Sequence, residues 1–247
     1  MTRARHSPWA DRVFLPYILR QFRKHFYGLY FLGEIPAIDP DLPLLITPNH
    51  STWWDGFFLY ILNKRLLKRK LHLMMLEEQL SKYRFFSRIG AFGIEPGLPR
   101  RAYAALEYSA EMLRDSANAL CIFPQGVLRY SGLRPLEFQR GVGHILKLHG
   151  GEVNLLPLGI RCEFLIDQRA EAFFLADRVF QVSHKNYQGI EWLEQQEEEL
   201  LSRLSRAILL GEKGQVVVKG KEPINLRWDA LLRRHPPTKS GSEGMLG

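Results

Sequence analysis

His50 and Asp55 are two side chains whose types and spacing could support acid–base chemistry. Four residues lie between them, and within one helix this offset would hold the two side chains about 140° apart. If His50 instead lies on a loop after a strand and Asp55 in the first turn of the next helix, they can meet. The carboxylate would then bond one imidazole nitrogen and leave the other free as a general base, with no nucleophilic Ser or Cys required.

A structural role explains the same residues. Thr52 and Asp55 have the spacing of a capping box for a helix that enters at Trp53. An aspartate in a first helical turn also suits the helix dipole. On these residues alone, the catalytic and the structural interpretation both stay open.

The apolar pattern predicts the elements that must position this pair. A short apolar run at residues 44–46 ends at Thr47-Pro48 and predicts a buried strand directly before His50, with a helix after it that ends near residue 67. Further strands are predicted at residues 71–76, 91–94, 118–123 and 153–160, and helices at residues 77–89, 98–114 and 140–149. Weaker signals predict a strand at 170–176, a helix at 190–210 and a strand at 215–219.

Strands that alternate with helices favour an α/β fold. We expect a single domain with a mostly parallel mixed sheet flanked by helices. Ligands of such sheets bind beyond the carboxyl ends of the strands. His50, Gln125 and the turn at Glu95 all follow predicted strands, which agrees with a shared site.

The first 31 residues read as a separate segment, ahead of a domain at residues 32–235 and a disordered tail at 236–247. Phe14, Ile18, Phe22 and Phe26 recur every four residues, among six basic residues and a single acid. This pattern predicts an amphipathic helix that lies in the headgroup plane of a membrane. The alternative is a helix packed on the body of the same protein.

Composition and the absence of certain motifs limit the classes of partner that we expect. The chain has 247 residues and a net charge of +8, which favours an anionic partner such as phospholipid headgroups, a phosphorylated substrate or nucleic acid. No known nucleic-acid motif, metal-ligand spacing or phosphate loop is visible, so we expect no nucleic-acid partner and no metal. No stretch approaches the roughly 18 apolar residues of a membrane span, and no signal peptide is visible. We therefore expect a peripheral protein on the cytoplasmic face of a membrane.

Several blocks of the sequence carry a family resemblance. The stretch Asn49 to Asp55, read as NHSTWWD, resembles the His-x4-Asp block of the glycerolipid acyltransferase superfamily, the lysophosphatidic acid acyltransferase group. Further blocks follow in the family's order at residues 123–126, 138–141 and 155–159, so the resemblance covers roughly residues 40 to 160.

The resemblance implies a reaction and a set of site residues. The reaction is transfer of an acyl group from a thioester donor, acyl-CoA or acyl-carrier protein, to a lipid hydroxyl. His50 would act as general base, Asp55 would hold the imidazolium, and no cofactor beyond the acyl donor is implied. The residues assigned to substrate binding are Asn49, Arg100, Arg101, Phe123, Pro124, Gln125, Gly126, Arg129 and Arg140.

The chain departs from the family at residues expected to bind the acceptor. Its second block lacks the usual nearby Arg, for which Arg100 and Arg101 are the nearest substitutes. Its third block has Gln125 in place of Glu and Leu128 in place of Arg, with Arg129 one position late. Three hypotheses follow: an acyltransferase for a lysophospholipid or glycerol-phosphate-type acceptor, one for a non-phosphate lipophilic alcohol such as a glycosylated pigment, or a non-catalytic lipid-binding protein.

Overall fold

The computed structural model describes residues 1–166, 168–212 and 214–222. Its strands are β1 (Phe26–Leu32), β2 (Leu44–Pro48), β3 (Lys70–Leu76), β4 (Ala91–Ile94), β5 (Asn118–Cys121), β6 (Val153–Glu163), β7 (Ala170–Leu175), β8 (Phe180–Val182) and β9 (Gln215–Lys219). Its α-helices are α1 (Pro8–His25), α2 (Asp55–Leu62), α3 (Glu77–Lys82), α4 (Pro99–Met112), α5 (Gly141–His149) and α6 (Ile190–Leu209). A π-helical turn at Asn63–Leu67 extends α2, and a 3-10 turn at Arg84–Ile89 follows α3.

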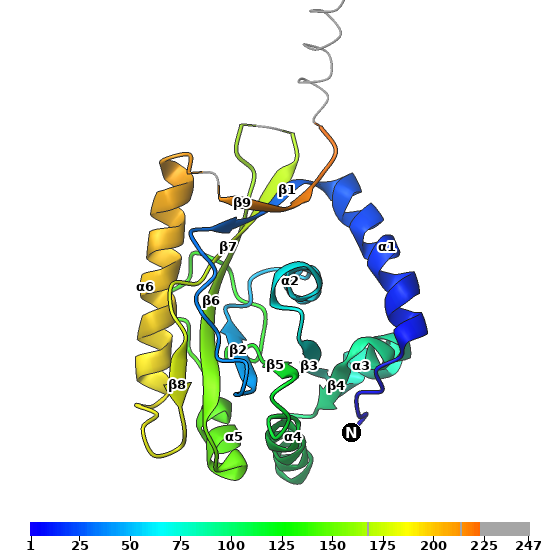
Figure 1. Cartoon of the computed structure of the whole chain (residues 1–247), viewed down its shortest axis with the longest axis vertical. Coiled ribbons are helices and arrows are strands. Elements are labelled where there is room, and N and C mark those ends of the chain that lie inside the picture. Colours follow the sequence, from blue (N-terminus) through cyan, green and yellow to red (C-terminus); the bar gives the residue numbers. More distant parts are fainter. Residues whose placement is uncertain (167, 213, 223–247) are drawn as a thin grey trace, which may run out of the picture.

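The strands of the described residues form one nine-stranded mixed sheet (Figure 1). Its order is β4-β3-β5-β2-β6-β7-β1-β9, and β8 pairs with β6 outside this path. The pairs from β4 across to β6 are parallel, as is β1 with β7, whereas β6 pairs with β7 and β8, and β1 with β9, in antiparallel fashion. The predicted α/β class, with a mostly parallel sheet flanked by helices, is confirmed.

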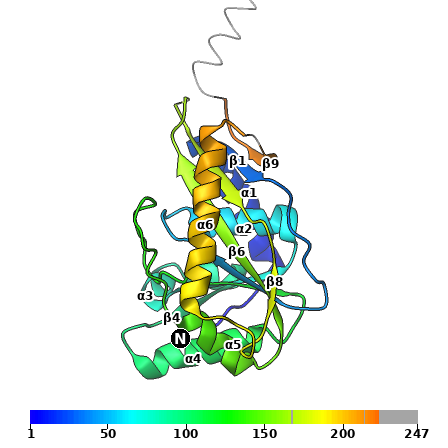
Figure 2. The same cartoon turned by 90° about the vertical axis from the view of Figure 1, so that its left-hand side faces the viewer.

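Helices cover both faces of the sheet. Because successive side chains of a strand point to opposite faces, Leu44 and Ile46 of β2 enter one apolar core while Leu45 enters the other. The first core lies beneath α1 and α2, and the second beneath α4, α5 and α6. Figure 1 shows α1 and α6 on opposite sides of the sheet, and Figure 2 shows α6 running along the outer side of β6. The central strand β2 is thus buried on both faces, and this packing holds its carboxyl end in place.

The predicted N-terminal helix is shorter than expected. α1 ends at His25, and residues 26–32 form β1, which lies between β7 and β9. The predicted boundary after residue 31 therefore falls inside a strand of the domain. The cause is local: Phe26 keeps the four-residue spacing of the helical stripe, but it opens the continuous apolar run FYGLYFL, which is typical of a strand buried on both faces.

The apolar stripe of α1 faces the protein's own core. Phe14, Ile18 and Phe22 are each at most 4% exposed and pack with residues of α2 and the sheet. The prediction that this stripe meets a membrane is therefore wrong. The opposite face of α1 carries Trp9 and Tyr17, which are 60% and 54% exposed. Any membrane contact by α1 must use this outer face.

The remaining predicted elements match the observed ones within a few residues, whereas β1 and β8 were not predicted. The predicted tail at residues 236–247 and the end of the predicted domain, from residue 223 on, lie outside the described residues. Within the described part of the chain, no helix has both the length and the apolar character that spanning a bilayer requires.

Candidate active site

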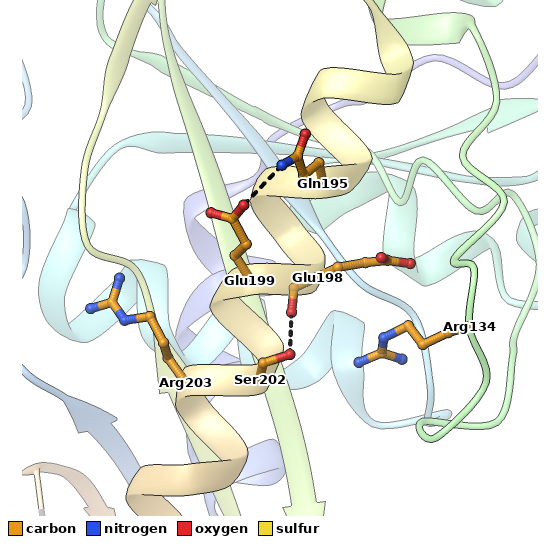
Figure 3. Close-up of a pocket in the computed structure, with 6 residues that line it drawn as sticks. All are labelled: Arg134, Gln195, Glu198, Glu199, Ser202 and Arg203. Atoms are coloured by element: carbon orange, nitrogen blue, oxygen red, sulfur yellow. Dashed lines mark hydrogen bonds between the residues drawn. The ribbon is translucent and has the colours of Figure 1, made fainter.

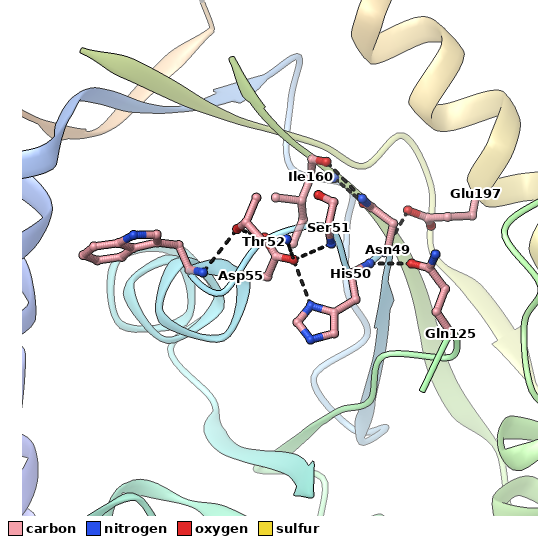
Figure 4. Close-up of polar contacts among 9 residues, drawn as sticks. Asn49, His50, Ser51, Thr52, Asp55, Gln125, Ile160 and Glu197 are labelled. Atoms are coloured by element: carbon pink, nitrogen blue, oxygen red, sulfur yellow. Dashed lines mark hydrogen bonds and ion pairs between the residues drawn. The ribbon is translucent and has the colours of Figure 1, made fainter. Parts of the chain in front are cut away.

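The His50–Asp55 pair forms at the carboxyl end of β2. The strand ends at Pro48, His50 lies on the loop that follows, and Asp55 is the first residue of α2. Nδ1 of His50 lies 2.9 Å from Oδ2 of Asp55 (Figure 4). The His50 side chain is 22% exposed, whereas that of Asp55 is fully buried. With Nδ1 donating to the carboxylate, Nε2 of the partly exposed ring carries the free lone pair that a general base needs.

Asp55 is fixed by further donors from its own loop. Oδ2 also accepts the backbone N–H groups of Ser51, at 2.7 Å, and Thr52, at 2.9 Å. Oδ1 accepts the Thr52 hydroxyl at 2.6 Å. The carboxylate therefore has one orientation, and the imidazole bonded to it has one as well. This is the positioning that a catalytic base requires.

Only one of the two contacts of a capping box is present: Asp55 accepts the Thr52 N–H, but the Thr52 hydroxyl does not accept the Asp55 N–H. α2 begins at Asp55, and the residue before it, Trp54, provides no side-chain cap. The Thr52 hydroxyl donates to Asp55 and accepts from the Trp54 N–H at 3.2 Å, rather than capping the amide of Asp55. Asp55 thus satisfies loop amides as a structural residue does, while one of its oxygens also holds His50.

The third block packs directly against His50. The Phe123 ring stacks on the imidazole with 4.1 Å between ring centroids and 23° between planes. The amide oxygen of Gln125 accepts the His50 N–H at 2.6 Å, and the Arg129 N–H donates to the His50 carbonyl at 2.9 Å. Gln125 is only 4% exposed, so this bond to the loop that carries His50 lies inside the protein. A Glu at this position could accept the same bond, so this substitution leaves the loop contact intact.

The remaining residues of this block shape the turn that carries it. The Gly126 N–H donates to the Phe123 carbonyl at 3.0 Å, and Gly126 has a φ of 69°, a left-handed conformation that favours glycine. The Pro124 carbonyl accepts the Gln139 N–H at 2.8 Å, which joins the third block to the fourth. Sequence-distant blocks therefore meet through their backbones.

Asn49 ties the loop to the neighbouring strand. Its side chain donates to the Ile160 carbonyl of β6 at 3.1 Å and accepts the Ile160 N–H at 2.7 Å (Figure 4). Its backbone N–H donates to Oε1 of Glu197, on α6, at 3.3 Å. Asn49 was predicted to bind substrate, but all of these contacts lie within the protein.

The predicted arginines divide into two groups. Arg129 lies beside His50, and its guanidinium pairs with Glu137. Arg101 pairs with Glu95 at 2.8 Å, and exposed Arg100 and Arg140 lie at the starts of α4 and α5. Among the contacts of the described residues, none joins Arg100, Arg101 or Arg140 to His50. The structure thus brings Asn49, Phe123, Gln125 and Arg129 to His50 and leaves the other arginines apart.

Sequence reasoning missed Glu197, which touches the site from α6. The signal was present: Glu197 occupies a position in the buried stripe of α6, between Leu193 and Leu200. A charged residue in an apolar stripe needs a partner or a proton. Burial raises the pKa of Glu197 to about 8, although the backbone amides of Asn49 and Leu158 and the charge of Arg134 act in the opposite direction.

An open depression on the outside of α6 lies away from this pair. It is lined by Arg134, Gln195, Glu198, Glu199, Ser202 and Arg203. Figure 3 shows these α6 side chains on the solvent side of the helix, with Arg134 reaching toward it from the loop after β5. Neither His50 nor Asp55 lines the depression, so we do not assign it to the reaction.

The fold and site define a class of protein: an α/β protein with a histidine bonded to a buried carboxylate at the carboxyl end of a central parallel strand. The chain belongs to the Acyltransferase family, whose family model matches residues 34–161, just over half of the chain. The resemblance to the glycerolipid acyltransferase superfamily is confirmed, and the protein is an enzyme that transfers acyl groups. A search of curated proteins finds no significant match. The family match contains β2, His50 and the third block, but neither α1 nor α6.

Proposed function

We propose that this protein is a peripheral membrane O-acyltransferase. It moves an acyl group from a thioester donor, acyl-CoA or acyl-carrier protein, to the hydroxyl of a lysophospholipid or glycerol-phosphate-type acceptor. The observation that carries the proposal is the His50–Asp55 pair, with Nδ1 bonded to a fully buried carboxylate at 2.9 Å and Nε2 left to act as base. The family match to residues 34–161 supports the reaction class.

The proposed step needs no acyl-enzyme. Nε2 of His50 takes the proton of the acceptor hydroxyl while its oxygen attacks the thioester carbonyl carbon. The tetrahedral intermediate collapses with cleavage of the C–S bond, and the imidazolium returns the proton to the departing sulfur. The products are an ester and a free thiol. Asp55 stabilises the transient imidazolium and keeps the ring in place.

The proposed function is tested by incubating purified protein with acyl-CoA, or with acylated carrier protein, and a panel of lipid alcohols. We expect esterification of a lysophospholipid or glycerol-phosphate-type acceptor, read as product mass. Esterification of neutral lipid alcohols alone would overturn the proposed acceptor class and favour the second hypothesis. Binding of lipids without any ester would favour the non-catalytic one.

Arg129 is the best-placed cation to recognise an acceptor phosphate. Its backbone touches His50, and its Nε is buried with no hydrogen-bond partner among the described residues. We expect Arg129→Gln to lower kcat/KM by about 10- to 100-fold for a lysophospholipid, the range for losing a hydrogen bond to a charged group. The contact through the Arg129 N–H does not depend on the side chain, so a neutral lipid alcohol should be affected less than about threefold.

Arg140→Gln is the matched comparison, because this exposed arginine makes no contact with His50 in the described residues. A selective loss with Arg140→Gln and none with Arg129→Gln would place the phosphate at α5 and contradict the assignment to Arg129. An equal loss for both acceptors with Arg129→Gln would make its role structural.

The outer face of α1 is the proposed membrane contact, on the cytoplasmic side of an anionic membrane. Trp9, Val13 and Tyr17 are each about half exposed or more, with exposed arginines at positions 12 and 20 beside them. Aromatic rings with cations on one helix face suit the headgroup region of anionic bilayers. Because the inner face of α1 belongs to the core, substitution rather than deletion is the appropriate test.

We expect the double variant Trp9→Ser and Tyr17→Ser to bind anionic phospholipid vesicles about tenfold or more weakly, because two bulky aromatic contacts are lost. Vesicle sedimentation measures this binding. Added salt should also weaken the binding of the intact protein, because it screens the attraction to anionic headgroups. Leu209→Ser is the control: this residue is 86% exposed, on α6 across the sheet from α1. Equal co-sedimentation of all three proteins would rule out α1 as the contact.

A further inference from the structure

Three carboxylates of α6 hold the backbone of the loops that carry the candidate site. Glu194 accepts the N–H groups of Glu137 and Phe138, each at 2.9 Å, and Glu198 accepts the Leu136 N–H at 3.2 Å. Glu197 accepts the Asn49 N–H at 3.3 Å. Glu194 and Glu198 are only partly buried, whereas Glu197 is fully buried. Glu197 is therefore the one of these three that reaches the residue next to His50.

The surroundings of Glu197 do not suit a charged carboxylate. Its Oε2 is buried and has no hydrogen-bond partner among the described residues. The backbone amide of Leu158, on β6, favours the ionised form of Glu197, but it leaves Oε2 without a hydrogen-bond partner. From the loop, Arg134 also favours ionisation, yet its guanidinium donates to the carbonyls of Ser131 and Leu133. A neutral carboxyl leaves one hydroxyl unpaired, which costs much less than an unpaired buried charge.

We propose that Glu197 is a positioning residue held as an uncharged carboxylic acid, which fixes Asn49 and through it the orientation of His50. Asn49 is then fixed at its backbone by α6 and at its side chain by Ile160 of β6. His50, the next residue, is fixed at its own N–H by Gln125. Ionisation of Glu197 would place a negative charge inside the core, with no hydrogen-bond partner for Oε2 among the described residues, and would loosen this loop.

The consequence for turnover rests on the proposed function, but the consequence for stability does not. The pKa of Glu197, raised to about 8 by burial, lies well above that of a carboxyl in the unfolded chain. The folded protein therefore keeps a proton that the unfolded chain releases, so raising the pH favours unfolding until the folded group also ionises. The folding equilibrium constant should fall by about tenfold for each pH unit between roughly pH 5 and pH 8, and no further above that range.

The experiment compares full-length wild type, Glu197→Gln and Glu197→Leu by urea unfolding at pH 6 and pH 8. Gln keeps an acceptor for the Asn49 N–H and cannot ionise. The folding equilibrium constant of Glu197→Gln, divided by that of wild type, should therefore rise by tens of fold from pH 6 to pH 8. Glu199→Gln is the control, since exposed Glu199 is bonded only by Gln195 in the described residues. A Glu197→Gln protein whose stability follows the wild-type pH dependence would overturn the uncharged state.

Turnover tests the positioning role. We expect kcat of wild type to fall above pH 8 and that of Glu197→Gln to persist, because only wild type gains the buried charge. Glu197→Leu leaves the Asn49 N–H unpaired and should lower kcat by about tenfold or more at pH 7, with KM changed less. A folded Glu197→Leu protein with the kcat of wild type would refute the positioning role of Glu197. If Glu197→Leu does not fold, the pH profile of kcat for Glu197→Gln decides whether Glu197 has this role. If wild type transfers no acyl group, the proposed function fails, while the unfolding result still decides the state of Glu197.

Discussion

His50→Ala should abolish acyl transfer while leaving the protein folded. The His50 ring is the group with a free basic nitrogen in the proposed site, and general base catalysis contributes about 10²- to 10⁴-fold. We therefore expect kcat to fall by about 10²- to 10⁴-fold, read as release of free thiol from the acyl donor together with product mass. The KM for the acyl donor should change little, because the role assigned to the ring is proton transfer.

The contacts of the loop explain why the fold should survive. Alanine keeps the backbone N–H that Gln125 accepts and the carbonyl that accepts from Arg129. The substitution removes one ring stack, on Phe123, and a side chain that is 22% exposed. His144→Ala, at an exposed position on α5, is the matched control and should behave as wild type. Wild-type turnover by folded His50→Ala protein would refute the assigned base.

Asp55→Asn should also lower kcat by orders of magnitude, but by less than His50→Ala, because the base stays present and loses only the carboxylate that orients it. The amide oxygen can take the place of Oδ2 and accept the Ser51 and Thr52 N–H groups, while the amide nitrogen faces the Thr52 hydroxyl. The loop is thus preserved, but no negative charge remains to stabilise the imidazolium.

The readout that separates this electrostatic role from a structural one is a matched comparison of turnover and urea unfolding. Asp55→Asn should lose turnover far out of proportion to stability. Asp55→Ala should lose both turnover and stability, because it leaves the two partly buried N–H groups of Ser51 and Thr52 without an acceptor. If Asp55→Asn unfolds as readily as Asp55→Ala, its effect on kcat cannot be ascribed to charge and the orienting role is contradicted.

Local patterns in the sequence were sufficient for most elements of the fold. Short apolar runs and capping signals indicate elements within a few residues, and the rule that ligands bind at the carboxyl ends of parallel strands placed His50 and Gln125 together. β1 was not predicted because Phe26 continues the helical spacing of α1, so periodicity alone could not show where the helix ends. The same ambiguity assigned the buried face of α1 to a membrane.

The part of the site that depends on residues close in sequence was predictable. The contacts that depend on how distant segments pack together were not. The loop geometry needed for His50 and Asp55 to meet follows from their offset of five residues. The role of Gln125 as an acceptor for the His50 N–H depends on how two loops approach each other, which a sequence does not reveal. Glu197 lies 148 residues from its partner Asn49, so only the assembled fold relates the two.

We propose that the acyl group passes directly from a thioester to a hydroxyl, with His50 as base and no acylated protein between. Mass measurement during turnover tests it most directly, by following donor, acceptor and intact protein in one reaction. Direct transfer predicts one free thiol for each acceptor ester formed, with the protein mass unchanged throughout. Accumulation of an acylated protein that forms ester only when acceptor is added would contradict direct transfer.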